Sequence, residues 1–414
     1  MRIACLCGSY LTSRGGAELY VHRIAGELAR RGPEVTVIAA EGPLAPFPDA
    51  PYRVVALKRD RRREEFARRL LALENVRGCY RLAQWLFRSG HHRLLAQGPC
   101  CPDLEKNGFL SGFDVVVLVR GGGAWPVQLG RAIIRRPSPL MVAVPLLHTR
   151  ESGAVHPVLR HVYSAFDGIV ALTGHERDWM KEHGWGDGRV MVAGAGSDEH
   201  FPPATRGEFR KRHGLTAGSP LVVFVGRKTF NKGAQHMIEA MDRVWAREPE
   251  ARLALLGFSH NPPEWTRGAI GSLRHPAEGR ILDLNDVSDE EREQALEDCD
   301  VFCMPSISES FGIAYLDAWR HRKPVIACRG CSSESIVEDG RTGLLVEFGD
   351  VGGIAEAILR LLSDGGLRTA MGECGHQEWR RKWTWSRIAR EMEAAFRERL
   401  AEGKTGVGRE ERRT

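Results

Sequence analysis

The sequence lacks long apolar runs, although 43% of its 414 residues are hydrophobic. No stretch approaches the ~18 consecutive apolar residues that a membrane-spanning helix needs. The first residues, MRIACLC, also lack a charged leader followed by a cleavable apolar segment. We therefore expect a cytoplasmic protein whose contact with a membrane is at most peripheral, at the inner face.

A strong charge imbalance is lacking too. The chain has 59 Lys and Arg against 53 Asp and Glu, a formal net charge of +6. Such a mild surplus suits an anionic small ligand or a membrane surface and does not require nucleic acid. The ten cysteines lie mostly within apolar runs, which is typical of reduced thiols. Cys328 and Cys331 have the CxxC spacing of a zinc or redox site, but no second pair with ligand spacing accompanies them.

Short apolar runs alternate with amphipathic stretches in the N-terminal half, as in RIACLCG, AELYVHRIAGELARRG and EVTVIAA. The apolar runs predict buried parallel strands, and the helical periodicity between them predicts crossover helices. The same alternation restarts at SPLVVFVGR, from residue 219. We therefore predict an α/β fold with two Rossmann-like, doubly wound domains.

The predicted domain organisation has four parts, the first of which contains an insertion. Residues 1–205 form the first domain and 206–385 the second, with a C-terminal helix over 386–404 that packs back towards the first domain and a disordered tail over 405–414. Residues 58–110 are a basic helical insertion in the first domain. This insertion is either a solvated helix pair that covers a sheet edge or a patch that faces an acceptor or an anionic membrane.

Two glycine-containing loops follow predicted strands. Gly15 and Gly16 precede the first helix, where backbone N–H groups can approach a phosphate or a sugar closely. The spacing is not GxGxxG, so a nicotinamide cofactor is not expected, and a plain turn is the alternative. In the second domain, a strand leads into Gly226, Arg227 and Lys228, and then into Lys232 and Gly233. Cations before a helix N-terminus predict a diphosphate pocket, with a solvated basic loop as the alternative.

The stretch SISESFGIAYLDAWRHRKPVIAC places Glu309 at the entrance of a predicted helix and Asp317 about two turns inside it. At that separation the two carboxylates cannot act as the close acid–base pair of a hydrolase. We interpret them as two contacts to one long ligand, with the free N–H groups of Ser310, Phe311 and Gly312 between them for a phosphate. A capping Glu and a helix-surface Asp are the alternative reading.

These motifs together resemble the retaining glycosyltransferases of family 4, which are two-domain GT-B enzymes. The resemblance rests on the GGAE loop, the GR and KG pair, the Glu-x7-Glu element in ESFGIAYLD, and the segments LTGHERDWM, VMVAGAGSDEHFPP and KPVIAC. It covers nearly the whole chain. It implies a GT-B fold whose two domains face each other across a cleft.

The resemblance also implies roles for individual residues. Arg227 and Lys232, after Gly226, would hold the donor diphosphate. Glu309 would contact the transferred sugar, within a donor-binding element that includes Ser310, Phe311, Gly312 and Ile313. Asp317 stands where the family has a second Glu that binds the nucleotide ribose, and it is one methylene shorter. Gly15 and Gly16 would face the diphosphate and acceptor, and His148 would lie near the reacting sugar, although a lone His after a strand is also a common structural residue.

The implied activity is transfer of a sugar, with retention of configuration and without a metal, from a nucleotide-diphosphate sugar to an acceptor hydroxyl. UDP- and GDP-sugars are the expected donors, and no other cofactor is expected. Polysaccharide precursors, lipid-linked glycans and small molecules remain open as acceptors. The alternatives are a sugar-nucleotide-binding protein without turnover and a nucleotide-sugar epimerase on the same scaffold.

Overall fold

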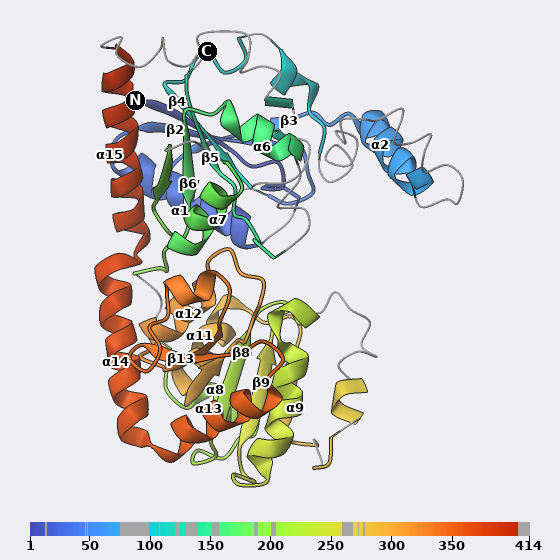
Figure 1. Cartoon of the computed structure of the whole chain (residues 1–414), viewed down its shortest axis with the longest axis vertical. Coiled ribbons are helices and arrows are strands. Elements are labelled where there is room, and N and C mark those ends of the chain that lie inside the picture. Colours follow the sequence, from blue (N-terminus) through green and yellow to red (C-terminus); the bar gives the residue numbers. More distant parts are fainter. Residues whose placement is uncertain are drawn as a thin grey trace. The chain divides into compact units, whose positions relative to one another are not determined.

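The computed structural model describes residues 1–404 apart from 13–14, 46, 48, 75–98, 107, 121–124, 127, 130–138, 151–156, 186–188, 200–203, 259–267, 272 and 276–277. The chain divides into two compact units (Figure 1). The first comprises Met1–Gly194 and the segment from Trp385, and the second comprises Ala195–Thr384. The division therefore falls about ten residues before the predicted boundary at 205. The predicted tail over 405–414 and much of the insertion over 58–110 lie outside the described residues.

The first unit is built on a parallel sheet of seven strands in the order β3-β2-β1-β4-β5-β6-β7. Its strands are β1 (Arg2–Leu6), β2 (Glu34–Ala40), β3 (Arg53–Leu57), β4 (Val115–Val119), β5 (Leu140–Val144), β6 (Gly168–Ala171) and β7 (Val190–Val192). Its helices are α1 (Gly16–Arg30), α2 (Arg61–Glu74), α6 (Pro157–Ser164), α7 (Gly174–Glu182) and α15 (Trp385–Lys404), with a 3-10 turn at Pro102–Glu105. All five residues of the central strand β4 are buried, as expected for a parallel sheet covered on both faces.

The second unit contains a parallel sheet of six strands in the order β10-β9-β8-β11-β12-β13. Its strands are β8 (Leu221–Val225), β9 (Arg252–Leu256), β10 (Ile281–Leu284), β11 (Val301–Cys303), β12 (Val325–Cys328) and β13 (Gly343–Val346). Its helices are α8 (Glu208–Arg212), α9 (Ala234–Trp245), α11 (Asp289–Asp298), α12 (Ile313–Arg320), α13 (Val351–Ser363) and α14 (Gly365–Lys382), with 3-10 turns at Phe230–Lys232 and Ser332–Ser335. The predicted pair of doubly wound domains is confirmed.

The C-terminal helix α15 belongs to the first unit, where it packs on α1. The ring of Tyr20 meets that of Trp385 edge-on, with 5.6 Å between centroids. Arg31 Nε lies 2.7 Å from Glu393 Oε2, and Arg399 donates to the carbonyl of Asp167. Both apolar and ionic contacts therefore join the C-terminal helix to the first unit.

Helices α12 and α14 pack closely in the second unit because one of them carries a glycine at the contact. The fully buried Trp319 on α12 donates from Nε1 to the carbonyl of Thr342, 2.9 Å away. A Cβ at Gly375 on α14 would lie 2.2 Å from the ring of Trp319. The absence of a side chain at Gly375 is therefore what admits the indole.

Replacement of Gly375 by Ala tests this packing. We expect the second unit to lose about 1–3 kcal/mol of stability, the usual cost of overpacking, although Ala favours a helix by about 1 kcal/mol. Gly365→Ala is the matched control, because Gly365 is exposed on the same helix and its nearest neighbour is the end of the Arg368 side chain at 3.6 Å. Equal urea midpoints for the two variants would contradict the packing argument.

Candidate functional site

The predicted donor-binding residues of the second unit gather at the carboxyl edge of its sheet. The strand order reverses between β8 and β11, so the loops that follow these two strands leave the sheet side by side. One loop carries Gly226, Arg227 and Lys232, and the other carries Glu309 and the start of α12. Ligands of open α/β sheets bind at such a reversal point.

Lys232 joins the two loops. Its Nζ lies 2.7 Å from Glu309 Oε1 and donates to the carbonyl of Ser308 at 2.9 Å. Both side chains are largely buried, with 12% of Lys232 and 9% of Glu309 exposed. The carbonyl of Asn231 accepts from the backbone N–H of Ile307 and from the hydroxyl of Ser306. A cation and a carboxylate are thus held in contact at the reversal point.

Gly233 is required by the close approach of the same two loops. Its φ is 77°, in the left-handed region, and a Cβ there would lie 2.4 Å from the carbonyl oxygen of Pro305. It also caps α9. Lys232 can reach Glu309 because the next residue has no side chain.

Helix α12 begins at Ile313, four residues after Glu309, and has no side-chain cap. Its N-cap is Gly312, with φ 103° and no side chain that caps the helix. The first N–H groups of an α-helix have no partner within it. The side chain of Phe311 is buried against Trp383, with 5.3 Å between ring centroids, so Phe311 faces the core. Ser310 and Ile313 are half-buried on either side.

Arg227 and Lys228 differ in their surroundings. Arg227 is exposed at the end of β8. Lys228 is fully buried, with its Nζ bonded to Asp283 Oδ1 and 3.1 Å from the carbonyl of Leu284. Lys228 therefore links the end of β8 to the end of β10, whereas Arg227 is the exposed cation of the two.

Asp317 lies one turn inside α12, not two, because the helix begins at Ile313. Its Oδ1 accepts a hydrogen bond from Ser197 Oγ at 2.5 Å. The guanidinium of Arg292 on α11 is a second neighbour. Burial opposes the charge of that guanidinium, but Asp317, Asp289 and Glu293 together raise its pKa above the ordinary value.

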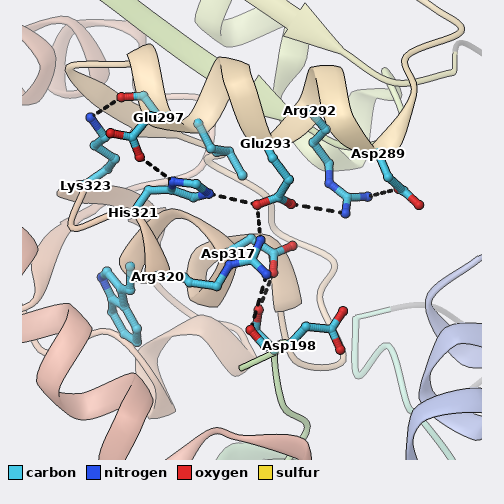
Figure 2. A network of polar contacts seen from close by, with 12 residues as sticks. Asp198, Asp289, Arg292, Glu293, Glu297, Asp317, Arg320, His321 and Lys323 are labelled. Carbon is cyan, nitrogen blue, oxygen red and sulfur yellow. Dashed lines mark hydrogen bonds and ion pairs between the residues drawn. The ribbon is translucent and has the colours of Figure 1, made fainter. Parts of the chain in front are cut away.

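A network of charged side chains joins α11 to α12 beside Asp317 (Figure 2). Glu293 Oε2 is bonded to Arg320 and lies 2.8 Å from His321 Nε2, while Arg292 approaches the other oxygen at 3.4 Å. The second nitrogen of His321 lies 2.7 Å from Glu297 Oε2. An imidazole between two carboxylates is stabilised as its cation.

The predicted residues of the first unit lie at the carboxyl edge of its own sheet. Gly15 is the N-cap of α1, in an extended conformation, and Gly16 opens the helix with open space around it. Beside them the buried Glu18 accepts a hydrogen bond from Ser9, whose hydroxyl also accepts from Arg120 Nη1 at 2.9 Å. Arg120 follows β4 with φ 92°, a strained conformation for a residue with a side chain.

His148 lies four residues beyond β5 and is half-buried. A buried carboxylate holds its loop: Glu176 accepts from the N–H of Leu147 at 2.8 Å and from that of Leu172 at 2.6 Å. Burial raises the pKa of Glu176 to about 7, against the effect of these two hydrogen bonds. The neighbouring Thr149 contacts His175 Nε2 at 3.1 Å. His148 is therefore on a well-anchored loop.

The cysteine and carboxylate patterns with metal-like spacing have structural partners. Cys328 and Cys331 are buried free thiols, and Cys331 Sγ lies 2.9 Å from Ser333 Oγ. Asp298 and Asp300 have Asp-x-Asp spacing; the first accepts from two backbone N–H groups and the second pairs with Arg210. Within the described part of the chain, no group of three or more potential ligands is placed to hold a metal ion, and no helix is long and apolar enough to span a membrane.

Sequence reasoning missed several residues that shape these sites. Ser9, Glu18 and Arg120 meet in the first unit, and Ser197 and Arg292 meet Asp317 in the second. The polar residues after strand ends, Ser9 and Arg120, carried a usable signal, because the carboxyl ends of parallel strands share one edge. Ser197 lies in the segment VMVAGAGSDEHFPP, but it is 120 residues from Asp317, and no local pattern pairs the two.

Comparisons with known proteins match both units. The family described as Glycosyl transferases group 1 matches residues 205–378, and the Glycosyl transferase 4-like domain matches 15–196. The D-inositol 3-phosphate glycosyltransferase of Corynebacterium glutamicum is 29% identical over 263 residues, 61% of this chain and 62% of the relative. The phosphatidyl-myo-inositol mannosyltransferase of Mycobacterium tuberculosis is 24% identical over 95% of both chains. The structure of Anabaena HepE in complex with UDP-glucose superposes with a TM-score of 0.70 at 18% identity, covering 98% of this chain and all of that one.

The His321 network predicts a pH-dependent stability. Burial disfavours protonation of His321, but Glu293 and Glu297 outweigh it and raise its pKa above the ordinary value. The folded state then binds a proton more tightly than the unfolded state, in which the pKa is about 6.5. The stabilisation is complete below that pH and is lost as the pH rises through the raised pKa. We expect the urea midpoint to fall over this range, and His321→Gln to flatten the fall.

His161→Gln is the control for this series, because His161 is exposed on α6 in the other unit. It should leave the pH profile of the urea midpoint unchanged. A His321→Gln profile that still follows the wild-type curve would show that the network does not hold a protonated imidazole.

Proposed function

The chain belongs to the group 1, family 4 glycosyltransferases of GT-B fold, and from this premise we propose that it transfers a sugar from a nucleotide-diphosphate sugar to an acceptor hydroxyl with retention of configuration. The observation that carries the proposal is the contact between Lys232 and Glu309 at the reversal point of the second sheet. This contact supports the proposal, because a cation suits a diphosphate and the neighbouring carboxylate can accept hydrogen bonds from sugar hydroxyls. Helix α12, whose N-cap Gly312 follows Glu309 by three residues, starts without a side-chain cap.

The proposed donor lies along this edge in three parts. Arg227 and Lys232 contact the diphosphate, where Arg227 is exposed and able to move onto an anion. Glu309 and the N–H groups that begin α12 contact the transferred sugar and adjacent phosphate. Asp317, one turn further along α12, accepts from the ribose.

The proposed chemistry needs charge stabilisation more than a strong base. The acceptor oxygen bonds to the anomeric carbon on the face from which the phosphate leaves, the carbon–phosphate oxygen bond breaks, and the acceptor proton passes to the departing phosphate oxygen. Lys232 and Arg227 stabilise the charge that develops on the diphosphate. The cations of the chain thereby supply the role that a metal has in other transferases, so we propose that none is required.

The residues of the first unit are assigned to the acceptor side. His148, on the loop that Glu176 anchors, is proposed to contact the reacting sugar, and Gly15 and Gly16 allow close approach to the start of α1. The named relatives act on inositol 3-phosphate and phosphatidyl-myo-inositol. Phosphorylated inositols are therefore the first acceptors to test, with UDP-glucose and GDP-mannose as the first donors.

The basic helix α2 is proposed to serve a membrane-bound acceptor. Its N-terminal half is fixed to the unit by Glu64, which accepts from the N–H of Cys100 and pairs with Arg59. Phe66 is 62% exposed on the outer side, with Arg69 nearby at 77%. An exposed aromatic ring among arginines suits an anionic lipid surface at the inner face of the membrane.

The proposed transfer is tested by mixing the protein with UDP-glucose or GDP-mannose and an inositol phosphate, and by following the anomeric proton by NMR. We expect an α-linked product from an α-linked donor. Glu309→Gln should slow the transfer about 10²-fold, because the carboxylate is lost where sugar hydroxyls and Lys232 meet. Glu356→Gln, which changes an exposed carboxylate of α13, should be silent.

Thermal shift in the same donor panel separates the alternatives, because a bound ligand raises the melting temperature. Lys232→Ala should reduce the shift given by UDP or GDP, and Lys211→Ala, at an exposed lysine of α8, should not. Stabilisation without product across the acceptor panel would favour a binding protein. Release of an epimerised sugar nucleotide without acceptor would favour an epimerase.

Co-sedimentation with vesicles tests the proposed membrane contact. Vesicles that contain anionic lipid should retain the protein at low salt and release it at high salt. Phe66→Ser should weaken retention, while Phe258→Ser, at a comparably exposed ring of the second unit, should not. Equal retention by neutral and anionic vesicles would contradict the electrostatic part of the proposal.

A further inference from the structure

Ser197 is a buried hydroxyl that contacts the acid assigned to the ribose. Only 1% of Ser197 is exposed, and its Oγ lies 2.5 Å from Asp317 Oδ1. A carboxylate can only accept, so the hydroxyl donates. Among the hydrogen bonds of the described residues, this is the one that fixes the Asp317 carboxylate, and it uses one of the two oxygens.

The main chain of Ser197 is itself held on two sides. Its N–H donates to the carbonyl of Trp383 at 3.0 Å, and Ser197 pairs with Thr384 as an isolated parallel bridge. The next residue, Asp198, accepts at its carbonyl from Arg320 Nη1 at 3.3 Å (Figure 2). A movement of Ser197 would therefore disturb the backbone at Trp383 and Thr384, and also the charged network of α11 and α12 through Arg320.

We propose that Ser197 is a positioning residue that orients Asp317 for the donor ribose and compensates for its short side chain. The inference rests on the proposed function, since it takes Asp317 as the ribose contact. With Oδ1 bonded to Ser197, rotation of the carboxylate is restricted, and Oδ2 is the oxygen that we assign to the ribose hydroxyl. An aspartate that is already oriented loses less conformational freedom when a ligand binds.

From the same geometry we expect that a longer acid would not fit at position 317 unless Ser197 also changes. A Glu at 317 would push its carboxylate one methylene further, into the place of the Ser197 hydroxyl, 2.5 Å from the present oxygen. Removal of that hydroxyl would make room for the longer chain. Ser197 and Asp317 thus act as a matched pair. We expect substitution of either residue alone to weaken ribonucleotide binding, and substitution of both together to preserve it.

The same pair lies next to the residues at which the chain passes between the units. These passages are at 194/195 and 384/385, and Ser197 bonds to Trp383 and Thr384 beside them. Ribose binding at Asp317 should therefore rigidify both segments. Amide hydrogen exchange of peptides that contain Ser197 and Thr384 should slow in UDP or GDP for the wild type, and much less for Ser197→Ala.

Isothermal titration with UDP, GDP and their 2′-deoxy counterparts tests the proposal. We expect the wild type to prefer the ribonucleotide, because Asp317 accepts from a ribose hydroxyl. Ser197→Ala should weaken ribonucleotide binding about tenfold, the effect of a hydrogen bond to a charged group, and lower the preference over the deoxy form. Asp317→Glu should also weaken binding, and the double variant Ser197→Ala, Asp317→Glu should recover the preference.

Two further variants separate positioning from folding. Ser197→Thr keeps the hydroxyl and should keep the preference for the ribonucleotide. Ser219→Ala removes another buried hydroxyl of the second unit, one that donates to the carbonyl of Thr216, and should leave binding unchanged. Ser197→Ala with wild-type affinity and preference would overturn the inference and leave the proposed function standing. A wild type that binds no nucleotide would overturn both.

Discussion

The contact between Lys232 and Glu309 depends on one constraint, the reversal of strand order between β8 and β11. Only there do the loops after two neighbouring strands diverge to opposite faces of the sheet and leave a shared edge. Gly233 permits their approach, the carbonyl of Asn231 accepts hydrogen bonds from Ser306 and Ile307, and α12 starts later in the same loop, at Ile313. The charged pair, the helix start and Asp317 are all consequences of this one topological feature.

The charged side chains of the second unit form two groups: those at the proposed ligand-binding edge and those that stabilise the fold. Lys228 and Lys232 are four residues apart, yet one is sealed against Asp283 and the other meets Glu309 at the edge. Glu293 likewise serves His321 and Arg320 inside the α11–α12 contact. Burial costs each of these ions its hydration, so each is paired. The fixed pairs leave Arg227 as an exposed cation beside the reversal point.

Much of this could be read from the sequence. Continuous Val, Ile and Leu runs predicted the parallel strands, and the family motifs predicted that Lys232 and Glu309 belong to one site. The failures have physical reasons. The sequence does not distinguish the surroundings of Arg227 from those of Lys228. The contact between the ends of β8 and β10 determines that the Lys228 side chain is the buried one. The start of α12 was placed too early because Gly312 adopts a positive φ that delays the helix. Ser197 and Asp317 are distant in sequence, and no periodic pattern encodes such a pair.

Gly233 sets a limit on how this binding edge can be altered. The carbonyl oxygen of Pro305 occupies the space that a Cβ at Gly233 would need. No amino acid with a side chain can therefore be introduced there without separating the two loops. Gly312 is similarly enclosed by the ring of Tyr315. Attempts to redesign ligand preference are thereby directed away from the loops that hold the charged pair, and towards positions such as Ser310 and Ile313, whose side chains are only half-buried.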